Sequence, residues 1–201
     1  MAPRFNISKG DRFNIAKSEG LEKIKAVLRW EGDCDLDASV FLCNDEGQIV
    51  NDEAFVFYNS ENRSEAFDRN VHRNKNNWRK VTRPMSADGA VLGSFDSLEG
   101  GVETIDIDLN KVDPEVSEIV IVATIHGDDG TMGNAQNARI SVINADNDEE
   151  LCEYALNEQF TSETAVEIAR LTINEDGDWT FEPIGIGHEG GIQTLIDIYA
   201  S

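Results

Sequence analysis

Apolar and polar positions alternate over short stretches of the chain, which is the pattern of half-buried β-strands. Residues 103–109 alternate strictly, so we expect their three apolar side chains to face a core and their aspartates to face outward. Residues 119–126 form a continuous run rich in β-branched side chains, which is typical of a central strand buried on both faces. The same criteria predict further strands at 23–30, 36–43, 48–50 and 54–59.

Two hairpins and one helix complete the prediction. Residues 138–144 and 151–156 flank an acidic turn, and residues 165–173 and 179–185 flank a turn that contains Asp176-Gly177. The last apolar residues keep the i, i+3, i+4, i+7 spacing of one amphipathic helix and are Ile192, Leu195, Ile196 and Tyr199. We therefore expect a mainly β protein, a β-sandwich with a short C-terminal helix.

The tetrapeptide Arg-Phe-Asn-Ile occurs twice near the N-terminus, at 4–7 and at 12–15. A Lys-Gly-Asp turn separates the two copies, so they are expected to pair as edge elements of a sheet. The length of 201 residues fits one domain, 1–201, with an insertion at about 60–85.

Residues 60–85 differ from the rest of the chain because basic side chains concentrate there. They are Arg63, Arg69, Arg73, Lys75, Arg79, Lys80 and Arg83. Such a segment can bind RNA, a phosphorylated ligand or an acidic partner, or it can neutralise the acidic body of its own or a neighbouring molecule. We favour the structural or oligomeric role, because long charged segments are more often solvated than dedicated to a ligand.

The whole chain is strongly acidic, with 39 acidic and 17 basic residues and a formal net charge of −22. Phosphate backbones and anionic lipid surfaces repel such a protein, so general nucleic-acid binding is not expected. No run approaches the ~18 apolar residues of a membrane span. Met1–Phe5 begins no export signal, so we expect a cytoplasmic protein.

The three cysteines indicate neither a disulfide framework nor a zinc site, because they are odd in number and lack Cys-x-x-Cys spacing. Cys43 and Cys152 lie among apolar residues and are expected to be buried small side chains. Cys34 lies between two aspartates, which would raise its pKa and make it a poor nucleophile.

The segment Asp33-Cys34-Asp35-Leu36-Asp37 places three carboxylates at alternate positions. In an extended chain they would form one row, which is either solvated or neutralised by a hard cation such as calcium. An EF-hand loop starting at Asp33 would require Gly and Glu where the chain has Ala38 and Asn44, so that loop is excluded. Any calcium ligands must therefore also come from elsewhere in the chain.

Several blocks, spread over almost the whole chain, resemble the TerD family of tellurite-resistance and stress proteins. They are Ile7-Ser8-Lys9-Gly10, Asp35-Leu36-Asp37-Ala38-Ser39, Phe55-Val56-Phe57-Tyr58-Asn59, Ser86-Ala87-Asp88-Gly89-Ala90-Val91, Ala123-Thr124-Ile125-His126, Ser162-Glu163-Thr164-Ala165 and Gly185-Ile186-Gly187-His188-Glu189-Gly190-Gly191. The resemblance implies a cytoplasmic β-sandwich that binds calcium in loops at one end, acts in resistance to tellurite and other stresses, and has no established catalytic activity.

The chain also departs from the family pattern. The insertion replaces a short loop, and Gly101 and Val102 replace a pair of aspartates before Glu103. Two fewer carboxylates would weaken or remove one of the family's calcium sites. The metal ligands that we predict are Asp35, Asp37, Asn59, Asp96 and Glu103, with Asp33 and Asp88 in reserve and backbone carbonyls of the Gly-rich loop filling remaining positions.

The first functional hypothesis is a non-enzymatic calcium-binding stress protein that associates with other stress-resistance proteins, or with itself, in a calcium-dependent way. A small-ligand or nucleotide-binding module using the insertion is an alternative. A metal-assisted hydrolase is less favoured, since the only histidines are His72, His126 and His188 and they show no zinc-binding or nucleophile motif. His126 and His188 could nevertheless meet in space, although a lone His at a strand end is usually structural.

Overall fold

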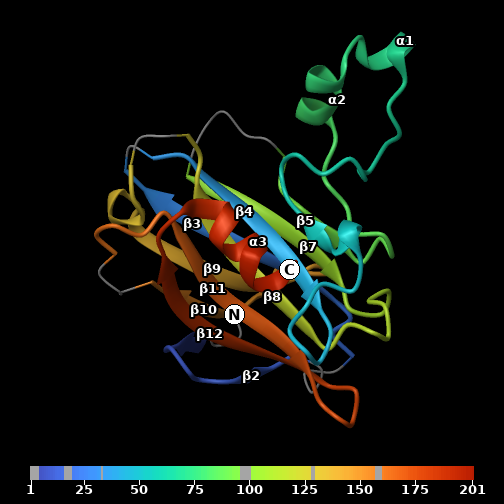
Figure 1. The fold of residues 1–201 in the computed structure, drawn as a ribbon. Coiled ribbons are helices and arrows are strands. Elements are labelled where there is room, and N and C mark those ends of the chain that lie inside the picture. Colours follow the sequence, from blue (N-terminus) through green and yellow to red (C-terminus); the bar gives the residue numbers. More distant parts are fainter. Residues whose placement is uncertain (1–4, 16–19, 33, 96–100, 128–129, 157–159) are drawn as a thin grey trace.

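Two six-stranded sheets packed face to face form the body of the protein (Figure 1). The computed structural model describes residues 5–15, 20–32, 34–95, 101–127, 130–156 and 160–201. The first sheet has the order β1 (Phe5–Ile7), β10 (Glu150–Ala155), β9 (Gln136–Asn144), β3 (Lys23–Glu31), β7 (Val102–Asp108) and β6 (Val91–Leu92). The second has the order β2 (Phe13–Asn14), β12 (Trp179–His188), β11 (Ala165–Ile173), β8 (Glu118–Ile125), β4 (Leu36–Cys43) and β5 (Phe55–Val56).

The main core lies between the sheets and is built from alternate side chains of each strand. Ile105 and Ile107 of β7 are buried there, as are Val40 and Leu42 of β4. Burying one apolar face of each sheet is the main stabilising contribution in a sandwich. The predicted β-sandwich is therefore confirmed, and the alternation of 103–109 places its apolar residues inward as expected.

A second, smaller core covers the outer face of the second sheet. Helix α3 (Gly191–Tyr199) buries Leu195 and Tyr199 against Phe41, Val120 and Val122. The predicted C-terminal amphipathic helix is confirmed. It lies across the sheet in Figure 1, so β8 and β4 are buried on both faces, which explains the uninterrupted apolar run of β8.

Both predicted hairpins are confirmed, since β9 pairs with β10 and β11 with β12 in antiparallel register. The strand predicted at 48–50 is wrong, because that segment makes only one isolated bridge, between Cys43 and Ile49. The strand predicted at 54–59 is shorter than expected. A 3₁₀ turn, η1 (Asp52–Ala54), precedes β5, and the chain turns away again at Tyr58. A second 3₁₀ turn, η2 (Met132–Asn134), precedes β9.

The predicted pairing of the two Arg-Phe-Asn-Ile copies is wrong. The β1 strand pairs in parallel with β10 in the first sheet, whereas β2 pairs with β12 in the second. The turn between them crosses from one sheet to the other, with Gly10 at φ +82° and its N–H bonded to the carbonyl of Pro183 at 3.1 Å. Each copy thus covers the edge of a different sheet, which satisfies more backbone groups than pairing the copies together.

Residues 60–85, which we call the arm, extend away from the sandwich in Figure 1. Two backbone hydrogen bonds close the base of the arm, from Ser64 to Arg83 at 2.8 Å and from Met85 to Asn62 at 3.0 Å. Its far end holds helices α1 (Arg69–His72) and α2 (Lys75–Val81), which pack against each other. The arm is therefore a folded hairpin with a small helical head.

Arg63 holds the head together, because its buried guanidinium donates to main-chain oxygens on both sides of the arm. The acceptors are the carbonyls of Tyr58, Ser60, Arg79 and Thr82 and the Thr82 hydroxyl. Trp78 is 3% exposed and donates its indole N–H to the carbonyl of Glu65 at 2.7 Å. The head thus has an interior of its own, built around a charged side chain rather than an apolar cluster.

The cysteines Cys43 and Cys152 are buried, as predicted, and burial raises the pKa of each thiol to about 12. No disulfide joins Cys34, Cys43 and Cys152. Within the described ranges, no helix has the length and apolarity needed to cross a membrane.

We expect Arg63→Met to unfold the arm locally and to leave the sandwich folded. The substitution leaves several buried carbonyls without a donor, each at a cost of roughly 1–3 kcal/mol. Hydrogen exchange followed by mass spectrometry should show lost protection across 60–85 and unchanged protection in β8 and β11. Arg69→Met, at an exposed position of the same arm, is the matched control and should change neither. Equal protection of the arm in both variants would contradict this role of Arg63.

Candidate metal site

A buried carboxyl group lies at one end of the inter-sheet core. Glu103 belongs to the inward-facing row of β7, with Ile105 and Ile107, and only 7% of it is exposed. Alternation along the strand forces this orientation, because the two isoleucines can be buried only if Glu103 points the same way. A carboxylate in such a place is costly unless hydrogen bonds or a cation stabilise it.

The environment of Glu103 strongly favours the neutral form. Burial is the largest cause of a rise in its pKa to about 8, and the nearby carboxylates of Asp37 and Asp35 contribute to the same rise. Hydrogen bonds from the Ser94 hydroxyl and from the Ala38 backbone N–H oppose this shift without cancelling it. Three carboxyl groups from β7, β4 and the segment before β4 are therefore close enough for their charges to interact.

Asp37 occupies the opposite face of β4 from the inter-sheet core. Leu36 and Ala38 point between the sheets, so Asp37 is directed to the outer face of the second sheet. There its Oδ2 lies 2.7 Å from His126 Nδ1, and the backbone N–H of His126 donates to the carbonyl of Asp35 at 2.9 Å. His126, directly after β8, therefore holds the side chain of Asp37 and the backbone of Asp35.

Asn59 lies at the same end of the second sheet. Strand β5 runs antiparallel to β4 and leads into the turn at Tyr58 and Asn59. The Tyr58 ring meets the His126 ring edge-on, with 5.4 Å between centroids. The exposed Asn59 side chain is therefore next to a residue that contacts the Asp37–His126 pair.

Of the other predicted ligands, Asp88 alone lies within the described residues, and it is not brought to this group. Asp33 and Asp96 lie outside the described residues. Asp88 precedes β6, near the opposite end of β7 from Glu103, and its carboxylate accepts hydrogen bonds from the Ser86 hydroxyl and from the backbone N–H groups of Ala90 and Asp113. Asp88 is thus engaged in local turn structure.

The carboxyl groups suit calcium by their chemistry more than by their arrangement. Asp35, Asp37 and Glu103 offer hard oxygen donors, and a cation would relieve their mutual repulsion. In the part of the chain that the structure describes, however, no three Asp, Glu, His or Cys side chains converge into a ready metal site. The reason is the strand geometry, which directs Glu103 into the core and Asp37 to the outer face of the second sheet.

His126 and His188 bond to separate carboxylates, Asp37 and Glu167. His188 Nε2 lies 2.7 Å from Glu167 Oε1, and the Tyr199 hydroxyl donates to Glu167 Oε2 at 2.8 Å. This second group is buried beneath α3 and anchors the helix to β11 and β12. It resembles a satisfied internal network rather than a reactive centre.

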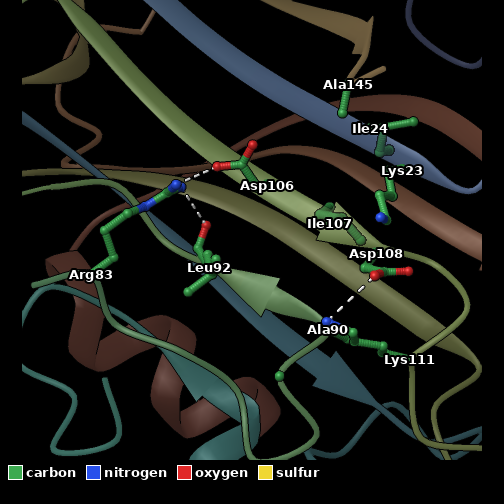
Figure 2. A pocket seen from close by; sticks show the side chains of 11 residues that line it. Lys23, Ile24, Arg83, Ala90, Leu92, Asp106, Ile107, Asp108, Lys111 and Ala145 are labelled. Carbon is green, nitrogen blue, oxygen red and sulfur yellow. Dashed lines mark hydrogen bonds and ion pairs between the residues drawn. The ribbon is translucent and has the colours of Figure 1, made fainter. Parts of the chain in front are cut away.

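A cavity of about 340 Å³ lies at the edge of the first sheet, near the opposite end of β7 from Glu103 (Figure 2). Its charged lining is internally neutralised. Arg83 pairs with Asp106, and Lys111 lies 3.5 Å from Asp108, which is also opposite Lys23 across the β3–β7 ladder. Because each carboxylate already has a basic neighbour, we place no functional site in this cavity.

Sequence reasoning missed two residues of the carboxylate group, His126 and Ser94. His126 ends the central strand directly before Gly127, a position where polar side chains commonly line a site. That signal could have linked His126 to Asp37. Ser94 carried no recognisable signal, because its relation to Glu103 depends on the path of the chain beyond β6.

We expect Glu103→Gln to change the pH dependence of stability. The pKa of Glu103 is about 8 when folded against 4.5 for the free group. Its contribution is therefore fully present below pH 4.5 and is lost as the pH rises through 8. In urea unfolding with EDTA, the wild type should lose roughly 2–4 kcal/mol relative to the variant over this interval. Glu175→Gln, in an exposed turn, is the control, and parallel curves for wild type and Glu103→Gln would contradict the burial effect.

Comparison with known proteins agrees with this architecture. The chain is 29% identical to general stress protein 16U of Bacillus subtilis and 28% identical to tellurium resistance protein TerD of Serratia marcescens, with 96% of each chain covered in both cases. A crystal structure of a TerD homologue from Streptomyces coelicolor has a TM-score of 0.61 at 19% identity, covering 89% of this chain and 96% of that one. This last likeness supports the fold alone.

The sequence profile of the TerD domain matches residues 4–199, which is nearly the whole chain. The match includes Asp37, Glu103 and His126 as well as helix α3. The chain therefore belongs to the TerD domain family.

Proposed function

We propose that this protein is a non-enzymatic, calcium-binding stress-response protein of the tellurite-resistance type that acts through calcium-dependent association with other proteins. The observation that carries the proposal is the buried Glu103, whose charge interacts with those of Asp37 and Asp35 at one end of the sandwich. The names of the relatives, a general stress protein and a tellurium resistance protein, support the stress-response part.

The electrostatics of Glu103 favour a cation at this end. Burial and two neighbouring carboxylates hold the group neutral at physiological pH, so a divalent ion would be bound together with the loss of its proton. Calcium suits the donors best, because it accepts six to eight oxygen ligands and tolerates irregular geometry, as a rule at about 2.3–2.6 Å. Asp35, Asp37, Asn59, Asp96 and Glu103 would hold the ion, with Asp33 in reserve.

Binding would change what this end of the molecule offers to a partner. Without a cation, exposed Asp35 and half-buried Asp37 present negative charge beside the Tyr58 ring, which is 44% exposed. With the charge neutralised, the same aromatic surface becomes suitable for protein contact. We therefore propose that calcium controls association by removing repulsion, with the carboxylates acting as ligands.

A cytoplasmic location is part of the proposal. No disulfide joins the three cysteines, and two of them are fully buried, which suits a reducing compartment. No catalytic role is proposed, because His126 and His188 are engaged by separate carboxylates, Asp37 and Glu167.

We expect Asp37→Asn to weaken calcium binding by at least about tenfold, because it removes one charged ligand while keeping the shape of the side chain. Isothermal titration calorimetry should give a higher dissociation constant for the variant. The thermal midpoint of the wild type should rise with calcium and that of the variant should rise less. Asp45→Asn, in the exposed turn after β4, is the matched control and should behave as the wild type. Absence of binding heat and of any midpoint shift in the wild type would refute the proposal.

A further inference from the structure

The arm carries basic side chains that its own fold does not use. Arg63 and Arg83 donate mainly to backbone carbonyls, and Lys75 and Arg79 pair with Glu61. Three cations of the arm are left in solvent, where the described residues give them no acidic partner: Arg69, Arg73 and Lys80. These three side chains lie on α1, directly after it and near the end of α2.

The arm holds these cations away from the carboxylates of its own sandwich. The head packs within itself, and Figure 1 shows α1 and α2 extending from the sheets. The closed base and the buried Arg63 make this a fixed arrangement, so the head is already in place before it meets a partner. A preorganised surface loses less conformational entropy on binding than a flexible loop does.

Exposed apolar side chains lie among the free cations. Val71, between Arg69 and Arg73, is 72% exposed, and Val81, next to Lys80, is 61% exposed. Neither side chain contributes to the small interior around Trp78. Contact with an acidic protein surface would pair these basic groups and would also remove the exposed valines from water.

The body of this same chain supplies such a surface. Residues 60–85 contain seven basic and three acidic side chains, a net charge of +4, so the other residues carry −26 of the total of −22. Opposite net charges on two parts of one molecule attract the arm of one copy to the body of another.

We propose that the arm is a docking element that seats its cationic head against the acidic sandwich of a second copy of this chain. A nucleic acid would meet the same three cations, but three contacts give only weak binding to a polyanion. The acidic body of a second copy attracts the arm. Every molecule supplies both surfaces, so the two are present at equal concentration. The contact joins different surfaces of the two copies, so it builds closed rings or open chains unless two arms exchange reciprocally.

The first test is sedimentation velocity in EDTA, so that its outcome does not depend on the calcium proposal. We expect the wild type to self-associate at about 50 mM salt and to dissociate at about 0.5 M salt, because exposed charges are screened at high ionic strength. The triple variant Arg69→Glu, Arg73→Asp, Lys80→Glu should associate at least about tenfold more weakly. Asp is chosen at position 73 because that residue has φ +64°, which Asp tolerates.

A matched control reverses three exposed cations outside the arm, Arg12, Lys23 and Lys111, to Glu. It changes the net charge by the same amount, so it separates a specific role of the arm from a general charge effect. The control should associate clearly more strongly than the arm variant does. Equal loss in both variants, or a wild type that stays monomeric at low salt, would overturn the proposal.

The second test uses mixing. The arm variant keeps an intact acidic body, so when immobilised it should capture wild-type protein but should not capture itself. Capture of neither would overturn the proposal. A short RNA duplex serves as the competing probe: salt-sensitive RNA binding that the arm variant loses, together with a monomeric wild type, would assign the arm to nucleic acid instead.

Discussion

Burial of the facing sides of two sheets is the constraint on which the rest of this structure depends. Each strand between them alternates, so the side chains that fill the core also fix the direction of every other residue on the strand. On β7 this alternation carries a carboxyl group, Glu103, into the end of the core. On β4 it sends Asp37 to the outer face of the second sheet, where His126 meets it. The carboxylate group is therefore a consequence of how the sandwich packs.

The same end of the molecule combines a proton-binding carboxyl with neighbouring negative charge. The pKa of Glu103 is raised to about 8, mainly by burial. The carboxyl group therefore keeps its proton near neutral pH unless a cation lies beside it. Proton and divalent cation are two alternative ways of supplying that compensation. Our proposed function rests on this charge regulation.

The arm is built on a different principle from the sandwich. Its head is organised by the guanidinium of Arg63, which binds several backbone oxygens, and by one buried tryptophan. A segment of this size has too little apolar surface for an ordinary core, so hydrogen bonds to a charged group take over part of the stabilisation. The remaining cations are thereby free to face outward. Structural and surface roles are divided between basic residues that look equivalent in the sequence.

The sequence alone determined most of the longer strands, both hairpins, the C-terminal helix and the sandwich, because local alternation and turn residues reflect burial directly. It also singled out Asp35, Asp37 and Glu103. Only the tertiary structure decided that β1 and β2 join different sheets, that Asp88 is remote from Glu103, and that His126 binds Asp37. Those relations depend on which strands become neighbours across the sheets. Strand pairing over long separations is set by the packing of the whole chain, and no local pattern encodes it.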